Sequence, residues 1–214
     1  AGSDAGSLRT TAVRDGDHYI INGTKRFITN APHAGIFTVM ARSNPDIKGA
    51  SGISAFIVEA GTPGLTLRGY GLIDGGRAAE LTLDGVQLPP QAQLGEAGAA
   101  YPVLERAVGR GILALCAEAV GAMDCARDAT LEYLRTRRQF GVPLGSFQAL
   151  QHRMADMTVA AFQARSMALQ ASARLHTATP AERARLVSAA KAYVGQQARF
   201  VGQQAVQLHG GMGI

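Results

Sequence analysis

The first half of the chain alternates apolar and polar residues over short runs that are separated by turn residues. Residues 19–21 alternate in this way and lead into Asn22-Gly23, a dipeptide typical of two-residue hairpin turns. Further strands are predicted over residues 35–43, 53–60, 65–69 and 79–89. Several short strands at this spacing indicate an antiparallel β-barrel or β-sandwich domain, which we place at residues 1–97.

The apolar spacing then changes to steps of three and four residues, which is typical of helices. It predicts helices over residues 101–137 and 146–176. A third helix is predicted from Thr179 to Gly210, because Thr179 suits an N-cap, Pro180 the first turn and Glu182 the third helical position. Residues 98–214 are therefore predicted to form an antiparallel helical bundle, and the chain as a whole an α+β fold.

Three helices rarely close a bundle as well as four, so we expect a fourth helix outside this sequence. The opening residues 1–7, AGSDAGS, likewise read as the middle of a loop. Both ends of the chain are thus expected to continue into further structure, on this chain or on others.

Composition narrows the class of protein. No apolar run approaches the roughly 18 residues that span a bilayer, and no signal peptide is readable, so we expect a cytoplasmic protein without a membrane span. The net charge of +5 is scattered, without the basic stripe and interleaved aromatic residues typical of nucleic-acid binding. Cys116 and Cys125 are nine residues apart on one predicted helix, cannot bridge each other, and are expected to be buried thiols.

The sequence contains no motif that indicates metal binding or hydrolysis. The five histidines have neither mutual ligand spacing nor cysteine neighbours, so no metal site is predicted. The sequence also lacks a G-x-S-x-G nucleophile elbow. The candidate chemistry lies instead in glycine-rich and arginine-rich stretches.

Two stretches of the first domain suit a nucleotide-like ligand, and each has a plainer alternative. Residues 1–7 offer backbone N–H groups and the Ser3 hydroxyl to a phosphate, or form a flexible turn before a strand. In residues 25–30, KRFITN, a regular strand would present Phe27 and Thr29 on one face, as a flat polar heterocycle requires. The alternative is an ordinary hairpin strand that buries Phe27.

A third stretch lies at the end of the first predicted helix. Arginines at positions 135, 137 and 138 complement the negative end of the helix dipole, which explains them without any ligand. Phe140, Phe147 and Gln148 follow on a tight turn and add stacking and hydrogen-bonding groups suited to a nucleotide.

Taken together, these stretches resemble the acyl-CoA dehydrogenase family. The matching segments, in the family's order, are AGSD at residues 1–4, KRFITNA at 25–31, RTRRQFGVPLGSFQALQHRMADM at 135–157 and QLHGGMGI at 207–214. The resemblance implies a flavoprotein that uses FAD to remove the α and β hydrogens of an acyl-CoA thioester, giving a 2,3-enoyl-CoA. It also implies a homo- or hetero-oligomer, such as a tetramer, with an electron-transfer flavoprotein or a similar acceptor as partner.

The resemblance also assigns roles to residues of the first domain. Ser3 would lie where FAD and the CoA moiety meet, and so contact both cofactor and substrate. The isoalloxazine ring would be flanked by Phe27, Ile28 and Thr29. The Thr29 hydroxyl would lie near the flavin N5.

In the second domain the resemblance implies two further FAD contacts. The ADP part of FAD, bound mainly to a neighbouring subunit in this family, would be held by Arg137, Phe140 and Gln148. The end of the third helix would contact FAD through Gln207, Gly210 and Gly211. Gly210 is also expected to end that helix in the left-handed conformation.

The chain departs from the family where the catalytic base is expected. Abstraction of the α proton needs a carboxylate, and family members place a glutamate beyond the glycine pair, hence beyond Ile214, or near the start of the first bundle helix. The second position falls at Gly111, and Glu105, six residues earlier, reads as a solvated helix-start residue. We therefore assign no base within these residues. Ile112 replaces the arginine usual beside that position, which leaves Arg110 as the candidate substrate-binding arginine.

Two alternatives remain open. DGGRAAE at residues 74–80 and ALCAEAVGAM at 114–123 resemble the smaller subunits of paired bacterial acyl-CoA dehydrogenases. The chain would then be a non-catalytic or half-site partner subunit of a heteromeric enzyme. The other alternative is a flavin oxidase or monooxygenase on the same fold.

Overall fold

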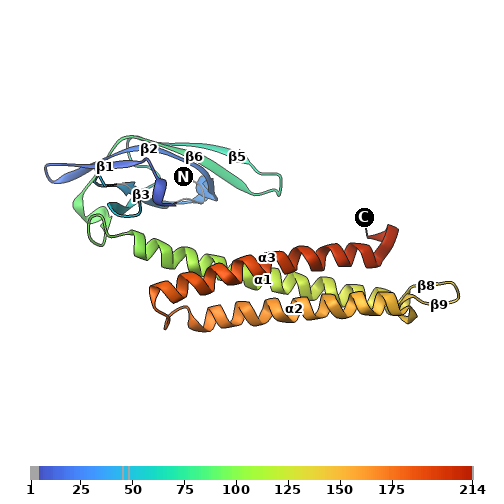
Figure 1. Ribbon diagram of the computed structural model, residues 1–214. Coiled ribbons are helices and arrows are strands. Elements are labelled where there is room, and N and C mark those ends of the chain that lie inside the picture. The colour runs from blue at the N-terminus through green and yellow to red at the C-terminus, as the bar shows by residue number, and fades with distance from the viewer. Residues whose placement is uncertain (1–4, 45, 48, 214) are drawn as a thin grey trace. The chain divides into compact units, whose positions relative to one another are not determined.

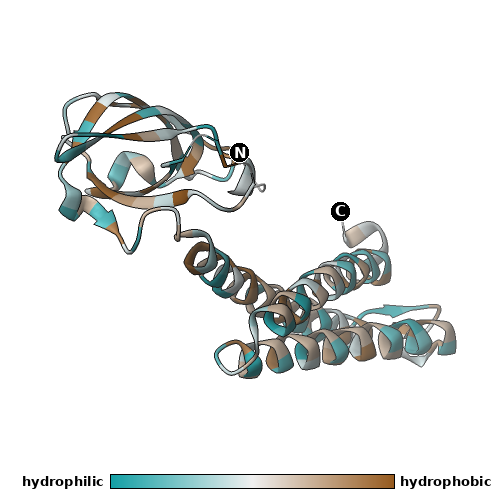
Figure 2. Cartoon of the chain, turned by 60° about the vertical axis from the view of Figure 1, so that its left-hand side comes forward, coloured by the Kyte–Doolittle hydropathy of each residue, from teal (hydrophilic) through white to brown (hydrophobic). Residues whose placement is uncertain are grey.

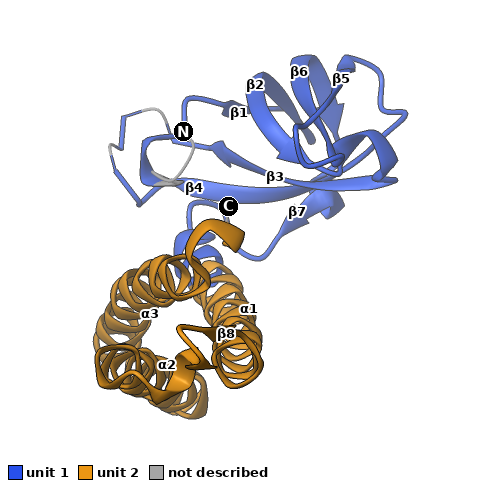
Figure 3. Ribbon diagram, turned by 90° about the vertical axis from the view of Figure 1, so that its right-hand side faces the viewer, with its two compact units in different colours: residues 1–105 blue, residues 106–214 orange. Residues whose placement is uncertain are grey.

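A computed structural model describes residues 5–44, 46–47 and 49–213, and its fold is of the predicted α+β class. Contacts divide the chain into two compact units, Ala1–Glu105 and Arg106–Ile214 (Figure 3). The first unit is built mainly from strands and the second from helices. None of the helices among the described residues is long and apolar enough to cross a membrane.

The first unit holds a seven-stranded sheet in the described part of the chain, in the order β5-β6-β2-β1-β3-β4-β7. Its strands are β1 (Thr11–Asp15), β2 (His18–Thr29), β3 (Ile36–Arg42), β4 (Ile53–Glu59), β5 (Leu65–Gly71), β6 (Arg77–Leu88) and β7 (Gln93–Leu94). All neighbouring strands pair antiparallel except β1 and β3, which meet in parallel at Thr11 and Arg42. Figure 2 shows the sheet curling around the apolar interior of this unit.

That interior is formed by the inward-facing residues of the paired strands. Ile21, Phe56 and Val86 are fully buried, as alternation along their strands requires. Tyr19 packs edge-on against Phe56 with ring centroids 5.0 Å apart. Four strands predicted from the sequence are confirmed as β3, β4, β5 and β6.

The predicted hairpin turn at Asn22-Gly23 is wrong. The chain turns earlier, between β1 and β2, where Gly16 has φ 60°, and β2 runs straight through Asn22. The register of β2 against β6 shifts between Ile21 and Gly23, where β6 carries the extra residue, so Asn22 lies opposite a bulge at Asp84-Gly85. Gly23 is needed there because a Cβ would lie 2.7 Å from the Thr10 hydroxyl oxygen.

The second unit contains three long helices among the described residues. They are α1 (Tyr101–Thr136, which begins in the first unit), α2 (Gln148–Arg174) and α3 (Pro180–His209). Figure 1 shows consecutive helices running in opposite directions, which confirms the predicted antiparallel arrangement. A short hairpin of β8 (Arg138–Gln139) and β9 (Val142–Pro143) joins α1 to α2.

Local sequence fixes the start of α3. The Thr179 hydroxyl accepts a hydrogen bond from the Glu182 N–H, and the Thr179 N–H donates to the Glu182 carboxylate at 3.1 Å. This is the reciprocal capping box that the sequence predicts, and it satisfies two N–H groups that the helix leaves free. The Thr179 hydrogen bonds also lower the pKa of the Glu182 carboxyl group.

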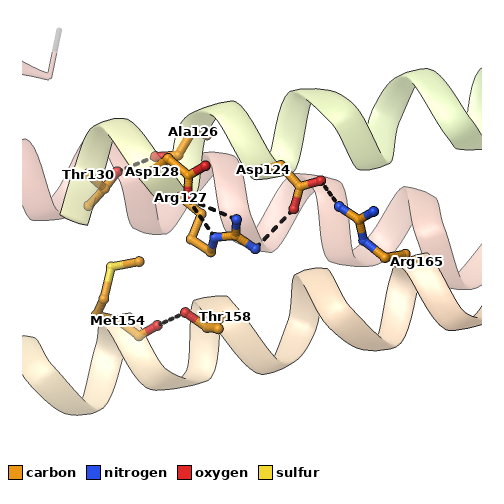
Figure 4. A network of polar contacts seen from close by, with 8 residues as sticks. All are labelled: Asp124, Ala126, Arg127, Asp128, Thr130, Met154, Thr158 and Arg165. Carbon is orange, nitrogen blue, oxygen red and sulfur yellow. Dashed lines mark hydrogen bonds and ion pairs between the residues drawn. The ribbon is translucent and has the colours of Figure 1, made fainter. Parts of the chain in front are cut away.

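The bundle core takes buried residues from all three helices. Met123, Val194 and Val201 of α1 and α3 share it with Met154 and Met157 of α2 and with a run of α2 alanines that includes Ala161 and Ala164. A polar cluster also links α1 to α2, where Asp124 pairs with both Arg127 and Arg165 (Figure 4). The small alanine side chains let α2 and α3 approach closely.

The expectation that both cysteines are buried holds for only one of them. Cys116 is buried in the bundle core, and this burial raises the pKa of its thiol. Cys125 is exposed on the same helix. Residues nine positions apart on an α-helix lie on different faces, so the two thiols have different surroundings.

Candidate cofactor-binding site

The KRFITN segment departs from the regular strand expected of it. The register of β2 against β6 shifts again between Lys25 and Ile28, and Phe27 has φ 56°. Phe27 is 75% exposed, so the alternative in which a hairpin strand buries this ring is wrong. Thr29 is also exposed, while Ile28 is half-buried. Because the bulge interrupts the two-residue alternation, Phe27 and Thr29 reach the surface without belonging to one regular strand face.

The backbone of Phe27 is strained. A positive φ is uncommon for a residue with a bulky side chain and costs about 1–2 kcal/mol. The ring gains an edge-on contact with Tyr70 of β5, with centroids 6.2 Å apart and planes at 83°. Strain of this kind persists where the surrounding structure enforces it, and it clusters at binding sites.

Phe27 lies on the wall of a groove of about 1140 Å³. The groove is lined by residues 7–10, which follow the glycine-rich start of the chain, and by residues 23–28 of β2. Its basic residues are Arg9, Lys25 and Arg26, and Arg26 forms an ion pair with Glu80 at 3.1 Å. Ser3, which the sequence assigns to this region, lies outside the described residues.

Lys25 lies between this groove and a second cavity. That cavity, of about 360 Å³, is lined by Lys25, Ile28, Thr29 and residues of β3. The Lys25 ammonium donates a hydrogen bond to the Met40 carbonyl at 2.7 Å. Burial lowers the pKa of Lys25 to about 8, because the charged form is poorly hydrated there.

A second group of candidate residues lies at the hairpin between α1 and α2. Phe140, at the tip, has φ 54° and is 89% exposed, and its ring meets Phe147 edge-on at 6.1 Å. Arg138 closes the hairpin by donating to the Gly141 carbonyl at 2.9 Å. Arg137 is exposed, and among the described residues its guanidinium has no hydrogen-bond or ion-pair partner. Of these two arginines, the structure therefore leaves Arg137 available to an anion. Gln148 is exposed at the first position of α2.

The third group lies at the end of α3. Gln207 is exposed on the last turn, and Gly210 ends the helix with φ 60° and ψ −139°. The expected left-handed conformation is therefore wrong in ψ, although the positive φ still favours glycine. Gly211 has no positive φ, and a Cβ there would meet no atom within 4 Å. Nothing within the described chain requires a glycine at position 211.

The residues considered for catalysis or substrate binding on α1 form no acid–base site. Arg110, Gly111 and Glu105 are all exposed, and Ile112 is half-buried at the bundle core. None of the described residues that line the groove beside Phe27 is a carboxylate. Among the described residues there is also no cluster of three metal-ligating side chains.

This fold and these sites define the class of protein. The family model for the acyl-CoA dehydrogenase middle domain matches residues 1–86, and that for the acyl-CoA dehydrogenase C-terminal domain matches residues 101–214. The chain therefore belongs to the acyl-CoA dehydrogenase family, as its motifs indicated.

Individual relatives agree with this assignment. Probable acyl-CoA dehydrogenase YngJ of Bacillus subtilis is 38% identical over 216 residues, which cover 100% of this chain and 56% of YngJ. The structure of butyryl-CoA dehydrogenase from Megasphaera elsdenii matches with a TM-score of 0.86 and 33% identity, covering 99% of this chain and 56% of that one. A structure described as PigA with FAD and proline matches with a TM-score of 0.90 and 32% identity, covering 99% and 56%. The chain thus spans about half the length of these relatives.

Proposed function

We propose that the protein containing this chain catalyses the FAD-dependent α,β-dehydrogenation of an acyl-CoA thioester to a 2,3-enoyl-CoA. The observation that carries the proposal is Phe27, an exposed aromatic ring held at φ 56° on the wall of a groove of about 1140 Å³. Such a ring is costly to present and offers a flat surface to a flat ligand. FAD supplies the acceptor for the hydride that leaves the β carbon.

The residues of the first unit suit the flavin ring in chemistry and in exposure. Phe27 and Ile28 offer apolar surface, and the exposed Thr29 hydroxyl can donate a hydrogen bond to the flavin N5. Ser3 is proposed to contact both FAD and the CoA moiety. The domain boundary that we propose between residues 97 and 98 keeps all four residues in one domain.

The residues of the second unit suit the ADP part of FAD. The Arg137 guanidinium has no side-chain partner among the described residues and can pair with a pyrophosphate. The exposed Phe140 ring can stack on a nucleotide, and the exposed Gln148 amide can hydrogen-bond to it. No contact within the described residues requires a glycine at position 211, so Gly211, like Gly210, can serve to let the backbone approach a ligand closely. Gln207 is proposed to contact the same ligand. Since the family resemblance assigns this FAD mainly to a neighbouring subunit, we propose a homo- or hetero-oligomer.

Removal of the α proton needs a base that these residues do not provide. The groove beside Phe27 has no carboxylate among the lining residues that the structure describes, and Gly111 occupies one of the two expected positions. We propose that a glutamate outside residues 1–214 acts as the base. Arg110 is proposed to contact the substrate, and an electron-transfer flavoprotein or a similar cytoplasmic acceptor to reoxidise the enzyme.

A half-site partner subunit is the second candidate function. It is favoured by Gly111 and Ile112, which stand where a glutamate and an arginine would otherwise serve catalysis. Such a subunit would hold FAD or complete the site of another chain without a base of its own.

The full-length protein tests these proposals. We expect it to purify with a yellow flavin that is bleached anaerobically when an acyl-CoA is added. We also expect it to turn over with an added electron acceptor and to consume little oxygen without one. A colourless protein that takes up no added FAD would contradict the flavin proposal. A yellow protein that no acyl-CoA bleaches would favour the partner subunit, and rapid oxygen consumption would favour an oxidase.

A further inference from the structure

One side-chain contact links the two FAD-contacting segments proposed for the second unit. The Tyr133 ring of α1 stacks on the His209 ring of α3, with centroids 4.4 Å apart and planes at 29°. The Tyr133 hydroxyl donates a hydrogen bond to the His209 backbone carbonyl at 3.3 Å. The two residues are 76 positions apart in the sequence, so only the fold brings them together.

Tyr133 lies one helical turn before Arg137, and His209 lies directly before Gly210. The Tyr133 carbonyl accepts a hydrogen bond from the Arg137 N–H at 2.8 Å, so Tyr133 forms the last helical turn before Arg137. His209 immediately precedes Gly210 and Gly211. The contact therefore sets the distance between the Arg137 turn and the glycine pair.

The His209 ring is itself fixed. Its Nδ1 lies 2.8 Å from the Ala205 carbonyl, which can only accept, so Nδ1 carries the proton and donates. The His209 carbonyl is one of the last four of α3 and begins the short 3-10 turn Gly210–Met212. The Tyr133 hydroxyl gives this carbonyl a further donor, from α1.

We propose that Tyr133 is a positioning residue for FAD. Tyr133 holds the glycine pair that follows α3 at a fixed place relative to Arg137. This inference rests on the proposed function, since it concerns the same cofactor. A plain helix–helix contact would stabilise the bundle with or without FAD. A positioning contact changes FAD affinity by more than it changes the stability of the apoprotein.

The test uses the full-length protein, stripped of FAD and titrated with FAD by fluorescence quenching. Tyr133→Phe keeps the stacked ring and removes the hydrogen bond, and Tyr133→Leu removes both. The matched control is Tyr193→Phe, which removes the hydrogen bond from Tyr193 of α3 to the side-chain oxygen of Gln163 on α2. Thermal unfolding of each apoprotein measures the structural effect alone.

We expect Tyr133→Phe to raise the Kd for FAD about 2- to 10-fold, Tyr133→Leu to raise it more than about tenfold, and the control to leave it within about twofold. If the Tyr133 variants lower the apoprotein Tm but bind FAD as tightly as the control, the contact is only structural and the inference is wrong. Wild-type protein that binds no FAD would instead overturn the proposed function.

Discussion

The Arg42 guanidinium donates a hydrogen bond to the Gly6 carbonyl at 2.9 Å, which ties the end of β3 to the segment that opens the groove. The same guanidinium donates to three carbonyls of the following loop, those of Ile47, Gly49 and Ser51. No carboxylate takes part in these contacts. Arg42 therefore serves as a clamp between two loops, and one of them continues into the groove wall at residues 7–10.

Replacement of Arg42 should loosen both loops. Arg42→Gln removes the fork geometry that reaches four carbonyls, and we expect a loss of about 1–3 kcal/mol in the free energy of unfolding. Hydrogen exchange should rise in residues 5–10 and in the loop after β3. Arg14→Gln is the control, because within the described residues the Arg14 side chain bonds only to the Gly16 carbonyl of its own hairpin. Unchanged exchange in both loops of Arg42→Gln would contradict the clamp.

We expect Phe27→Gly to impair the reaction at the flavin while it leaves the free energy of unfolding nearly unchanged. Glycine relieves the positive φ, worth about 1–2 kcal/mol, while loss of the Tyr70 ring contact costs about 0.5–1.5 kcal/mol. The two effects nearly cancel, so we expect urea unfolding to change by no more than about 1 kcal/mol. Flavin reduction by acyl-CoA should slow about tenfold or more.

The comparison for Phe27 is Phe37→Ala in the same sheet. Phe37 is buried, so its removal should cost about 3–5 kcal/mol of stability. If Phe27→Gly proves equally destabilising, the ring at position 27 belongs to the fold rather than to the site.

We expect Lys25 to contribute to the pH dependence of the free energy of unfolding. Its pKa is lowered to about 8 in the folded protein against 10.5 when exposed, so the unfolded chain binds more protons between these two values. The free energy of unfolding should therefore gain a contribution that rises from pH 8 towards 10.5. Denaturant unfolding across this range should show that Lys25→Met has lost the rise.

Lys191→Met on the exposed surface of α3 is the control for Lys25, and it should keep the rise of the wild-type protein. An identical pH profile for wild type and Lys25→Met would mean that Lys25 is as well hydrated in the folded protein as in the unfolded one.

Much of the fold was predictable because local sequence specifies it. The capping box at Thr179 and Glu182 lies within four residues and placed the start of α3 correctly. The predicted limits of α1 and α2 agree with the structure to within two residues, since helical periodicity persists over many turns. The candidate site residues stay predictions, and their motifs were found by resemblance rather than by spacing.

The failures share a cause. Asn22-Gly23 has the composition of a turn, yet Thr10 packs against Gly23, and Asn22 accepts a hydrogen bond from the Gly85 N–H at 2.8 Å. Thr10 lies just before β1 and Gly85 lies on β6, so no local reading of the dipeptide includes them. Phe27 was equally misread as a buried or regular strand residue, because the register shift against β6 that sets its φ depends on the neighbouring strand.

The sequence by itself determined the α+β class, the succession of a strand-rich half and three helices, and the family, because these follow from periodicity and from contiguous motifs. Tertiary structure alone decided that Phe27 is exposed and strained, that Arg42 joins two loops, and that Tyr133 stacks on His209. Each of these depends on contacts between residues far apart in the chain, and such contacts leave no periodic signal in the sequence.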